Sequence, residues 1–267
     1  MKKFALLGHD IGYSLSPKIH ACIYRHFGIH ASYTLLSVPR EELPAAVKTL
    51  RAYDGFNVTK PYKLDILRYL DADKSGIGTV NTVVSDNGRL TGYTTDGFGF
   101  MRHLDMMYGS PRGRRCLVLG AGGVARIIVP ELVAAGAEVY IFNRTEARAA
   151  ELAGACGCGV LRQTEVSDCR PQIIINCTSC GLKRGENPLP PIDMTELEFA
   201  YDTIYSPPVT DFMKSCAPFA RTENGLGMLI LQAIKADEYL LKIDTMSDIN
   251  SLYNEIKEAI TYEIADS

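Results

Sequence analysis

Short apolar runs rich in β-branched residues alternate with stretches of helical periodicity over the first sixty residues of the chain. The pattern predicts a strand at 4–8, a helix at 17–27, a strand at 32–38, a helix at 40–52 and a strand at 56–58. For the first helix, we expect Ser16 as the N-cap, Pro17 as the first helical residue and Gly28 after the end. Such regular alternation is typical of an α/β fold with a largely parallel sheet.

The pattern changes after Thr79. Two short extended runs, at 79–84 and 89–94, flank the tetrapeptide SDNG at 85–88. Because Asp or Asn followed by Gly between extended runs is a hairpin signal, we expect a β-hairpin here. A helix is expected over 97–108, after the hairpin.

A turn-rich segment, SPRG at 110–113, precedes a second series of elements. They are a strand over 116–120, a glycine-rich turn, a helix to Ala135, a strand over 137–143, a helix over 145–154, strands over 172–176 and 200–205, and helices over about 227–241 and 247–263. We therefore expect two α/β domains. Residues 1–100 and 236–267 would form the N-terminal domain with a mainly parallel sheet, and residues 101–235 a C-terminal, Rossmann-like domain.

Composition and charge restrict the class of ligand. The chain is 46% hydrophobic and 22% charged, which is ordinary for a globular protein, and its net charge is −3 with scattered Lys and Arg. The sequence has no cluster of basic residues of the kind that binds nucleic acid or an anionic membrane. The expected ligand is therefore a small molecule. The N-terminal apolar run is too short for a signal peptide and no stretch approaches the roughly 20 apolar residues of a membrane span, so we expect a soluble, cytoplasmic protein.

The eight cysteines are expected to be reduced thiols. Two close pairs, Cys156 with Cys158 and Cys177 with Cys180, could be imagined as a zinc site, but Cys177 ends an apolar run and a buried strand residue is the simpler interpretation. The five histidines show no metal spacing, so no metal is expected. His20 and His26 are expected on a helix surface.

A glycine-rich turn directly follows the strand over 116–120 and opens the next helix. The candidate cofactor-binding residues there are Gly120, Ala121, Gly122, Gly123, Val124 and Ala125. Gly120 would allow the tight turn, Gly122 would let the backbone approach a pyrophosphate, and Ala125 takes the place of the third small residue. The alternative is a glycine turn that binds nothing.

The end of the following strand bears on which dinucleotide would bind. A carboxylate there would bind the ribose 2′-hydroxyl of NAD, but the chain has Asn143, Arg144 and Thr145. A guanidinium and a hydroxyl suit a 2′-phosphate, so NADP is favoured over NAD. Arg148, one helical turn later, could join this charge cluster or could be a solvated helix residue.

Motifs along nearly the whole chain resemble those of the shikimate dehydrogenase family, which includes shikimate 5-dehydrogenase and the quinate/shikimate dehydrogenases. The shared motifs are SLSP (14–17), GFNVTKPYK (55–63), VNT (80–82), TDG (95–97), GAGG (120–123) with NRT (143–145), NCTS (176–179), Tyr205, and GML (227–229) with Gln232. So many ordered motifs at fitting separations make the resemblance specific.

The resemblance implies roles for individual residues in a cleft between the two domains. Ser14 and Ser16, with Tyr205, would hold a substrate carboxylate. The ring hydroxyls would be held by Thr59, Asn81, Asp96 and Gln232. Thr178 and Gly225 would lie on the cofactor side. A polyhydroxylated ring acid needs several short hydrogen-bonding groups, which these residue types supply.

GFNVTKPYK contains two lysines, and the resemblance assigns catalysis to Lys63, paired with Asp96. A helix is expected to begin at Pro61, which would place Lys63 in the first turn, where the helix dipole works against an ammonium group. Asp96 would oppose that effect and keep Lys63 charged. Such a lysine can donate a proton to a ketone oxygen while hydride arrives from a nicotinamide, and take it back in reverse. Lys60 is expected to be solvated.

Three positions depart from the family pattern. Tyr13 stands where His is usual, Thr94 where Asn is common, and Asn224 where Asp is usual. None of them is Lys63 or Asp96, but Thr94 and Asn224 bear on substrate preference.

The resemblance implies a reversible, NADPH-dependent reduction of 3-dehydroshikimate to shikimate, a step in chorismate and aromatic amino-acid biosynthesis, by a monomer or homodimer. One alternative is quinate/shikimate dehydrogenation with NAD, against which Arg144 argues. The other is a catalytically silent protein that binds NADP or shikimate, against which the Lys63 and Asp96 pair argues, because a binding module does not need a proton donor.

Overall fold

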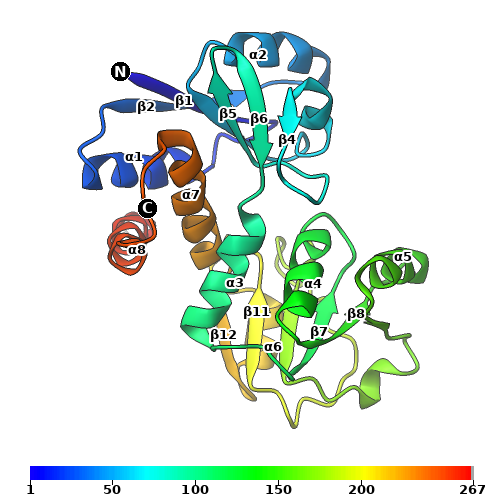
Figure 1. The fold of residues 1–267 in the computed structure, drawn as a ribbon. Helices are drawn as coiled ribbons and strands as arrows, with labels where there is room; N and C mark the ends of the chain where they lie inside the picture. The colour runs from blue at the N-terminus through cyan, green and yellow to red at the C-terminus, as the bar shows by residue number, and fades with distance from the viewer. Residues whose placement is uncertain (266–267) are drawn as a thin grey trace. The chain divides into compact units, whose positions relative to one another are not determined.

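The computed structural model describes residues 1–265, and the chain forms two compact units (Figure 1). Unit 1 comprises Met1–Gly99 and the chain from Leu229 onward, and unit 2 comprises Phe100–Met228. Both points of division fall within helices, α3 (Asp96–Met107) and α7 (Leu226–Leu241). Unit 1 is therefore built from both ends of the chain, with unit 2 inserted between them.

Unit 1 contains a six-stranded sheet in the order β2-β1-β3-β5-β6-β4. Its strands are β1 (Lys2–Gly8), β2 (Ala31–Ser37), β3 (Gly55–Val58), β4 (Ala72–Asp73), β5 (Thr82–Asp86) and β6 (Arg89–Tyr93). β1 pairs in parallel with β2 and β3, whereas β5 runs antiparallel to both β3 and β6. The sheet is thus mixed, with a parallel half and an antiparallel half.

The predicted hairpin is confirmed as β5 and β6. Asp86 pairs with Arg89, so the loop consists of Asn87 and Gly88 alone. Both residues have positive φ, 50° and 79°, which is the backbone that a two-residue turn of this hand requires and that Asn and Gly tolerate best.

The helices of unit 1 are α1 (Ser16–His26), α2 (Leu43–Leu50) after a 3₁₀ turn at Arg40–Glu42, a 3₁₀ helix at Asp65–Tyr69, the start of α3, the larger part of α7, and α8 (Ile249–Ala265). Figure 1 shows α8 beside α1, and the two helices are in contact. Gly28 follows α1 with a φ of 62°, as its position after the helix predicts.

Two predictions about helix starts are wrong. α1 begins at Ser16 itself with Leu15 in the cap position, and no side chain caps it. No α-helix begins at Pro61, because the chain makes turns from Lys60 to Leu64 before the short 3₁₀ helix at Asp65–Tyr69, and the Lys60–Pro61 peptide is cis. Proline is favoured both at the start of a helix and in a turn. A proline that follows a polar residue therefore does not tell a helix start from a turn.

The prediction that His20 lies on a helix surface is also wrong. His20 is buried, its ring stacks on Tyr33 at a centroid distance of 4.0 Å, and its Nδ1 lies 2.8 Å from Oδ2 of Asp237 on α7. Because Asp237 stands 217 residues further along the chain, the periodicity of α1 could not reveal this partner. His26 is only half-buried and its Nδ1 lies 2.9 Å from Glu255 Oε2 on α8.

Unit 2 contains a six-stranded sheet in the order β12-β11-β10-β7-β8-β9, in which every pairing is parallel. Its strands are β7 (Arg115–Leu119), β8 (Glu138–Phe142), β9 (Gly159–Val160), β10 (Ile173–Asn176), β11 (Phe199–Asp202) and β12 (Arg221–Glu223). Its α-helices, besides its parts of α3 and α7, are α4 (Ala125–Ala134), α5 (Glu146–Cys156) and α6 (Asp211–Cys216), and a 3₁₀ helix lies at Val166–Asp168.

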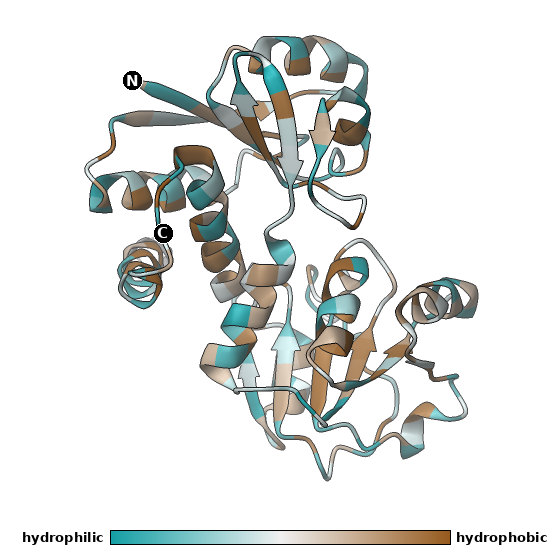
Figure 2. Ribbon diagram, in the orientation of Figure 1, coloured by the Kyte–Doolittle hydropathy of each residue, from teal (hydrophilic) through white to brown (hydrophobic). Residues whose placement is uncertain are grey.

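The central strands of unit 2 are apolar on both faces. The residues 116–119 of β7 and 173–175 of β10 are all buried, and β7 and β8 are strongly hydrophobic in Figure 2. An unbroken apolar run is what a parallel strand needs when both of its faces are covered. Alternate residues of β7 accordingly enter two different core clusters, Cys116 and Val118 in one and Leu117 and Leu119 in the other.

No helix within residues 1–265 is both long and apolar enough to cross a lipid bilayer.

The buried His20–Asp237 pair gives a prediction about stability. Burial raises the pKa of Asp237, while His20 opposes that shift. Replacing Asp237 by Ala leaves His20 buried without its partner, so we expect a loss of about 3–5 kcal/mol in the free energy of unfolding, measured by urea titration. Glu255→Ala is the matched control, because it breaks the half-exposed pair that His26 makes from the same helix, and should cost about 0–1 kcal/mol. Equal losses in the two variants would contradict the structural role assigned to Asp237.

Candidate functional site

Two charged side chains meet inside unit 1. The Lys63 ammonium donates a hydrogen bond to Oδ2 of Asp96 at 2.6 Å. Asp96 is 9% exposed and Lys63 28% exposed, so the pair is shielded on the carboxylate side and reaches solvent on the amine side. The amine is therefore held in place by the carboxylate and still accessible to a small ligand.

Asp96 is held from two directions. It is the first residue of α3, where the positive end of the helix dipole stabilises a carboxylate, and its Oδ1 accepts a hydrogen bond from the Asn81 amide at 2.9 Å. Asn81 immediately precedes β5 and Asp96 follows β6, so the hairpin brings the two residues together. The position of Asp96 after the hairpin therefore agrees with the sequence pattern.

The Asn81 amide nitrogen has more acceptors than hydrogens. Its Nδ2 lies within hydrogen-bond distance of Thr95 Oγ1 (2.9 Å), Asp96 Oδ1 (2.9 Å) and Gln232 Oε1 (3.1 Å). Since an amide NH₂ has two hydrogens, these three acceptors must share them. Gln232, on α7, is thereby drawn to the same cluster as Asn81 and Asp96.

The serines predicted to bind a carboxylate lie together where α1 begins. The Ser14 hydroxyl donates to the Ser16 hydroxyl at 3.1 Å, and Ser14 Oγ also accepts from the Ser16 backbone N–H at 3.2 Å. Thr59 follows β3, where its backbone N–H donates to Leu7 O at 2.9 Å. Thr59 is half-buried, so its hydroxyl can reach a ligand.

Tyr33 and Asn57 connect these serines to the Asn81 cluster, a link that the sequence analysis missed. The Tyr33 hydroxyl donates to Asn57 Oδ1 at 2.8 Å and is also hydrogen-bonded to the Ser16 side chain. Asn57 in turn donates to Thr82 Oγ1 at 3.1 Å, and that hydroxyl donates to Asn81 Oδ1 at 3.0 Å. The sequence does give one indication of the role of Asn57, because a polar residue in a short apolar strand needs a hydrogen-bond partner when that strand is buried, as β3 is.

The two lysines of GFNVTKPYK differ in the structure. Lys60 is exposed, whereas Lys63 pairs with Asp96. Lys63 lies in a turn and not in the first turn of an α-helix. The helix dipole that the sequence pattern led us to expect at Lys63 is therefore absent. What sets Lys63 apart is its ion pair with Asp96.

In unit 2, the glycine-rich turn between β7 and α4 has the shape that a dinucleotide needs. Gly120 has a φ of 104°, and a Cβ on it would lie 2.8 Å from Thr178 Cγ2. Around Gly122 and Gly123, by contrast, a Cβ would meet nothing within 4 Å. Open space at Gly122 and Gly123, before a helix N-terminus, fits a pyrophosphate that approaches the backbone.

The candidate 2′-phosphate residues follow β8. Asn143 Nδ2 donates to Thr145 O at 2.9 Å and so shapes the turn before α5. Arg144, Thr145 and Arg148 are exposed, and neither arginine forms an ion pair with another described residue. Two guanidinium groups without a carboxylate partner fit a phosphate better than a ribose hydroxyl.

Thr178 and Tyr205 follow the neighbouring strands β10 and β11. The Thr178 backbone N–H and hydroxyl both donate to Asn176 Oδ1, at 3.0 and 2.7 Å. Tyr205 is half-buried and comes three residues after Asp202, which pairs with Asn176 of β10. Gly225 is packed tightly, because a Cβ there would lie 2.2 Å from Thr203 O, and its N–H donates to Ile204 O at 3.1 Å.

The three departures from the family pattern have different surroundings. Tyr13 is largely exposed, and the Thr94 hydroxyl is buried without a partner among residues 1–265. Asn224 Oδ1 accepts from Leu226 N–H at 3.0 Å, as a carboxylate could, but its amide also donates to Pro208 O at 2.9 Å. A carboxylate could not make that second bond, so Asn224 adds a tie to the segment around Pro208.

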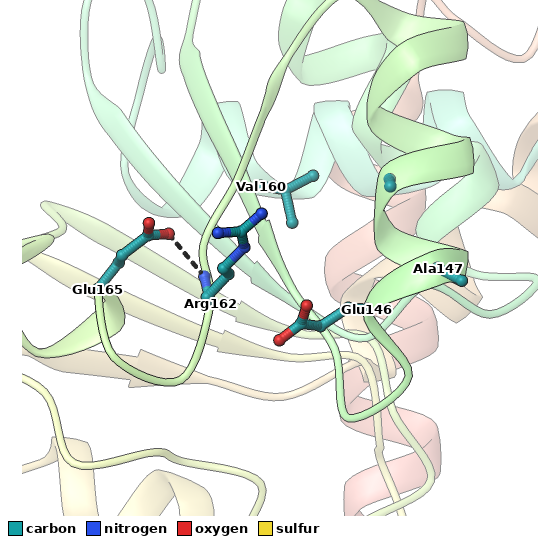
Figure 3. Close-up of a pocket in the computed structure, with 6 residues that line it drawn as sticks. Glu146, Ala147, Val160, Arg162 and Glu165 are labelled. Atoms are coloured by element: carbon teal, nitrogen blue, oxygen red, sulfur yellow. Dashed lines mark hydrogen bonds between the residues drawn. The ribbon is translucent and has the colours of Figure 1, made fainter.

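A surface pocket elsewhere in unit 2 contains none of the candidate residues (Figure 3). It is lined by Glu146, Ala147, Ala150, Val160, Arg162 and Glu165. Figure 3 shows Arg162 between the two carboxylates, and its backbone N–H donates to Glu165 Oε2 at 3.0 Å. In the part of the chain that is described, no three His, Cys, Asp or Glu side chains gather as metal ligands.

The fold defines an α/β protein with a Rossmann-like unit, and comparison with known proteins identifies its family. Residues 6–83 match the model of the shikimate dehydrogenase substrate binding domain, and residues 104–181 match that of shikimate / quinate 5-dehydrogenase. A shikimate dehydrogenase (NADP(+)) of Carboxydothermus hydrogenoformans is 37% identical over 254 residues, which are 89% of this chain and 90% of that protein. The chain belongs to the shikimate dehydrogenase family.

Solved structures agree with this assignment. Shikimate 5-dehydrogenase of Thermus thermophilus, in complex with NADP(H) and shikimate, is 33% identical with a TM-score of 0.87, covering 97% of this chain and 100% of that one. A ligand-free 5-ketofructose reductase of Gluconobacter is 29% identical with a TM-score of 0.80, covering 97% and 98%. The predicted fold class and family are confirmed, and the Gluconobacter structure shows that a reductase named for another substrate has a similar fold.

The glycine-rich turn gives a prediction that separates folding from ligand contact. Gly120→Ala would place a Cβ against Thr178 and the backbone of Cys177 at a positive φ, so we expect a loss of about 1–3 kcal/mol in the free energy of unfolding. Gly122→Ala, the matched control two residues away, should change that free energy by less than about 0.5 kcal/mol, because its Cβ meets only open space. Thermal and urea unfolding of both variants would measure the difference, and an unaffected Gly120→Ala protein would refute the close approach of Thr178.

Proposed function

We propose that this chain is a shikimate dehydrogenase that reversibly reduces 3-dehydroshikimate to shikimate with NADPH, as part of chorismate and aromatic amino-acid biosynthesis. The observation that carries the proposal is the Lys63–Asp96 ion pair, in which Asp96 also accepts from the Asn81 amide and Asn81 in turn contacts Gln232. These residues lie in the unit that includes the match to the substrate binding domain, residues 6–83.

In the reduction, Lys63 is the general acid and Asp96 its partner. NADPH, when bound, supplies the hydride that adds to the ketone carbon. The Lys63 ammonium gives its proton to the ketone oxygen as that oxygen gains negative charge, which yields the hydroxyl of shikimate. In the oxidation, neutral Lys63 takes the proton back. Because the proton that Lys63 gave stays on the new hydroxyl, the neutral amine takes up another proton from solvent after each reduction, and its side chain is 28% exposed. Asp96 holds the amine in place through their 2.6 Å contact.

The substrate would be held by neutral hydrogen-bonding groups. Ser14 and Ser16 are proposed to bind the carboxylate, together with Tyr205, and Thr59, Asn81 and Gln232 are proposed to bind the ring hydroxyls with Asp96. Most of these groups both donate and accept, which suits a polyhydroxylated ring. Asn81 and Gln232 already contact one another, so a bound hydroxyl can exchange with that contact at little cost.

We propose that unit 2 binds NADP. Gly120–Ala125 would contact the pyrophosphate, with Thr178 and Gly225 near it, and Asn143, Arg144, Thr145 and Arg148 would surround the 2′-phosphate. We further propose that unit 1 is the substrate-binding and catalytic domain, and that the protein is cytoplasmic and a monomer or homodimer. Its ligands are small molecules, as in the Thermus thermophilus structure with NADP(H) and shikimate.

The test is a spectrophotometric assay with shikimate or quinate and with NADP or NAD, followed at the nicotinamide absorbance. We expect turnover of shikimate with NADP. No turnover of shikimate with either cofactor would refute the enzyme and favour a silent binding protein. Turnover of both acids with NAD would move the protein to the quinate-using branch, which the matched family model also names.

The same assay separates the two lysines of GFNVTKPYK. Lys63→Ala removes the proton donor, so kcat should fall at least about 10²-fold, the lower end of what general acid catalysis contributes, while NADP affinity stays nearly unchanged. Lys60→Ala removes an exposed lysine three residues away and should keep kcat within about twofold. If Lys60→Ala lost activity and Lys63→Ala did not, the assignment of the general acid would be wrong.

Arg144 gives a prediction about cofactor choice. Arg144→Ala removes a charge-assisted hydrogen bond to the 2′-phosphate, so KM for NADP should rise about 10- to 100-fold, the equivalent of roughly 1.5–3 kcal/mol, with KM for NAD little changed. Arg170→Ala is the control, because it also removes one positive charge from unit 2. Arg170 precedes β10, whereas Thr178 follows it, so Arg170 lies at the other end of that strand. This substitution should change neither KM value. A parallel rise for NADP and NAD in Arg144→Ala would exclude a 2′-phosphate contact.

A further inference from the structure

Two polar residues lie fully buried side by side at the carboxyl ends of neighbouring strands in unit 2. Asn176 ends β10 and Asp202 ends β11, and the two are direct partners in the parallel pairing. Both have no exposed surface. Burial of a carboxylate is costly unless donors satisfy it, so this placement calls for an explanation.

Asp202 is satisfied by three donors that come from three different parts of the chain. Its Oδ1 accepts from Asn176 Nδ2 and from the Ile204 backbone N–H, both at 3.0 Å, and its Oδ2 accepts from the Thr210 hydroxyl at 2.6 Å. Burial raises the pKa of Asp202, and these donors act in the opposite direction. The carboxylate therefore joins β10, the segment after β11 and the start of α6.

On one side, this network fixes the residues after β10. Asn176 Oδ1 accepts from both the backbone N–H and the hydroxyl of Thr178, and Asn176 Nδ2 also donates to Cys180 O at 3.1 Å. Thr178 lies directly against Gly120, the first residue of the glycine-rich turn. The orientation of the Asn176 amide thus sets where Thr178 stands beside that turn.

On the other side, the network fixes the residues after β11, which include Tyr205. The bond to Ile204 N–H holds the backbone immediately before Tyr205. Thr210 uses its hydroxyl hydrogen for Asp202 and accepts from Met213 N–H at 3.2 Å, which caps α6. The segment between Asp202 and Thr210 is therefore anchored to the same carboxylate at both of its ends.

We propose that Asp202 is a positioning residue that sets Thr178, on the cofactor side, and Tyr205, on the substrate side, through one buried hydrogen-bond network. The proposal rests on the proposed function, because it takes Thr178 and Tyr205 as ligand contacts. Asp202 itself touches neither ligand. It differs from a residue needed only for folding in that its loss should weaken both binding steps in a protein that remains folded.

The test measures KM for shikimate, KM for NADP and kcat in Asp202→Ala. We expect both KM values to rise roughly tenfold, a loss of about 1.4 kcal/mol each, with kcat changed less, because Lys63 and Asp96 belong to unit 1. Asp202→Asn keeps the shape and two of the three contacts, so its KM values should lie between those of wild type and Asp202→Ala. The matched control is Phe212→Leu, which weakens the packing of buried α6 without altering a hydrogen bond and should lower Tm while leaving both KM values unchanged.

If Asp202→Ala does not fold, Thr210→Val carries the test, because it removes only the 2.6 Å bond and the α6 cap. It should raise KM for shikimate more than KM for NADP, since Thr210 anchors the Tyr205 side. Folded variants with a lowered Tm but unchanged KM values would overturn the positioning role and leave Asp202 a structural residue. Absence of shikimate turnover in the wild-type protein would instead overturn the proposed function itself.

Discussion

The contact between Lys63 and Asp96 is the interaction on which the candidate chemistry depends, and most of unit 1 serves to make it possible. Lys63 comes from the turn after β3, and Asp96 from the start of α3, 33 residues later. Only the hairpin β5–β6, with its two-residue turn, returns the chain so that Asn81 and Asp96 meet. A buried carboxylate at a helix N-terminus is stabilised before it meets the lysine, so the pair needs little further reorganisation.

A polar network extends from this pair across the core of unit 1. It runs from Asp96 through Asn81, Thr82 and Asn57 to Tyr33, which is hydrogen-bonded to Ser16. Buried polar groups are costly unless each has a partner, and here each side chain satisfies the next. The groups proposed for the two ends of the substrate are therefore parts of one network, and His20 stacks on the ring of Tyr33.

The sequence predicted those features that depend on neighbouring residues. The Asn87-Gly88 turn and the glycine-rich turn at Gly120 have backbone requirements that few residue types meet, so the residues themselves identify the geometry. The prediction that a helix begins at Pro61 is wrong because proline suits a helix start and a turn equally well. The burial of His20 and the Tyr33–Asn57 link could not be predicted, because each depends on a partner from a distant part of the chain, and periodicity carries no information about such partners.

Both units place their candidate groups by the same rule. In unit 1, Thr59 follows β3, and in unit 2, Gly120 follows β7 and Thr178 follows β10, each at the carboxyl end of a parallel strand. Ligands of parallel sheets bind beyond these ends, because the strands and their helices direct loops and helix N-termini to that edge. The mixed sheet of unit 1 adds an antiparallel hairpin to this plan. That addition supplies Asn81 and Asp96, the groups that hold the proposed general acid Lys63 through the Lys63–Asp96 contact.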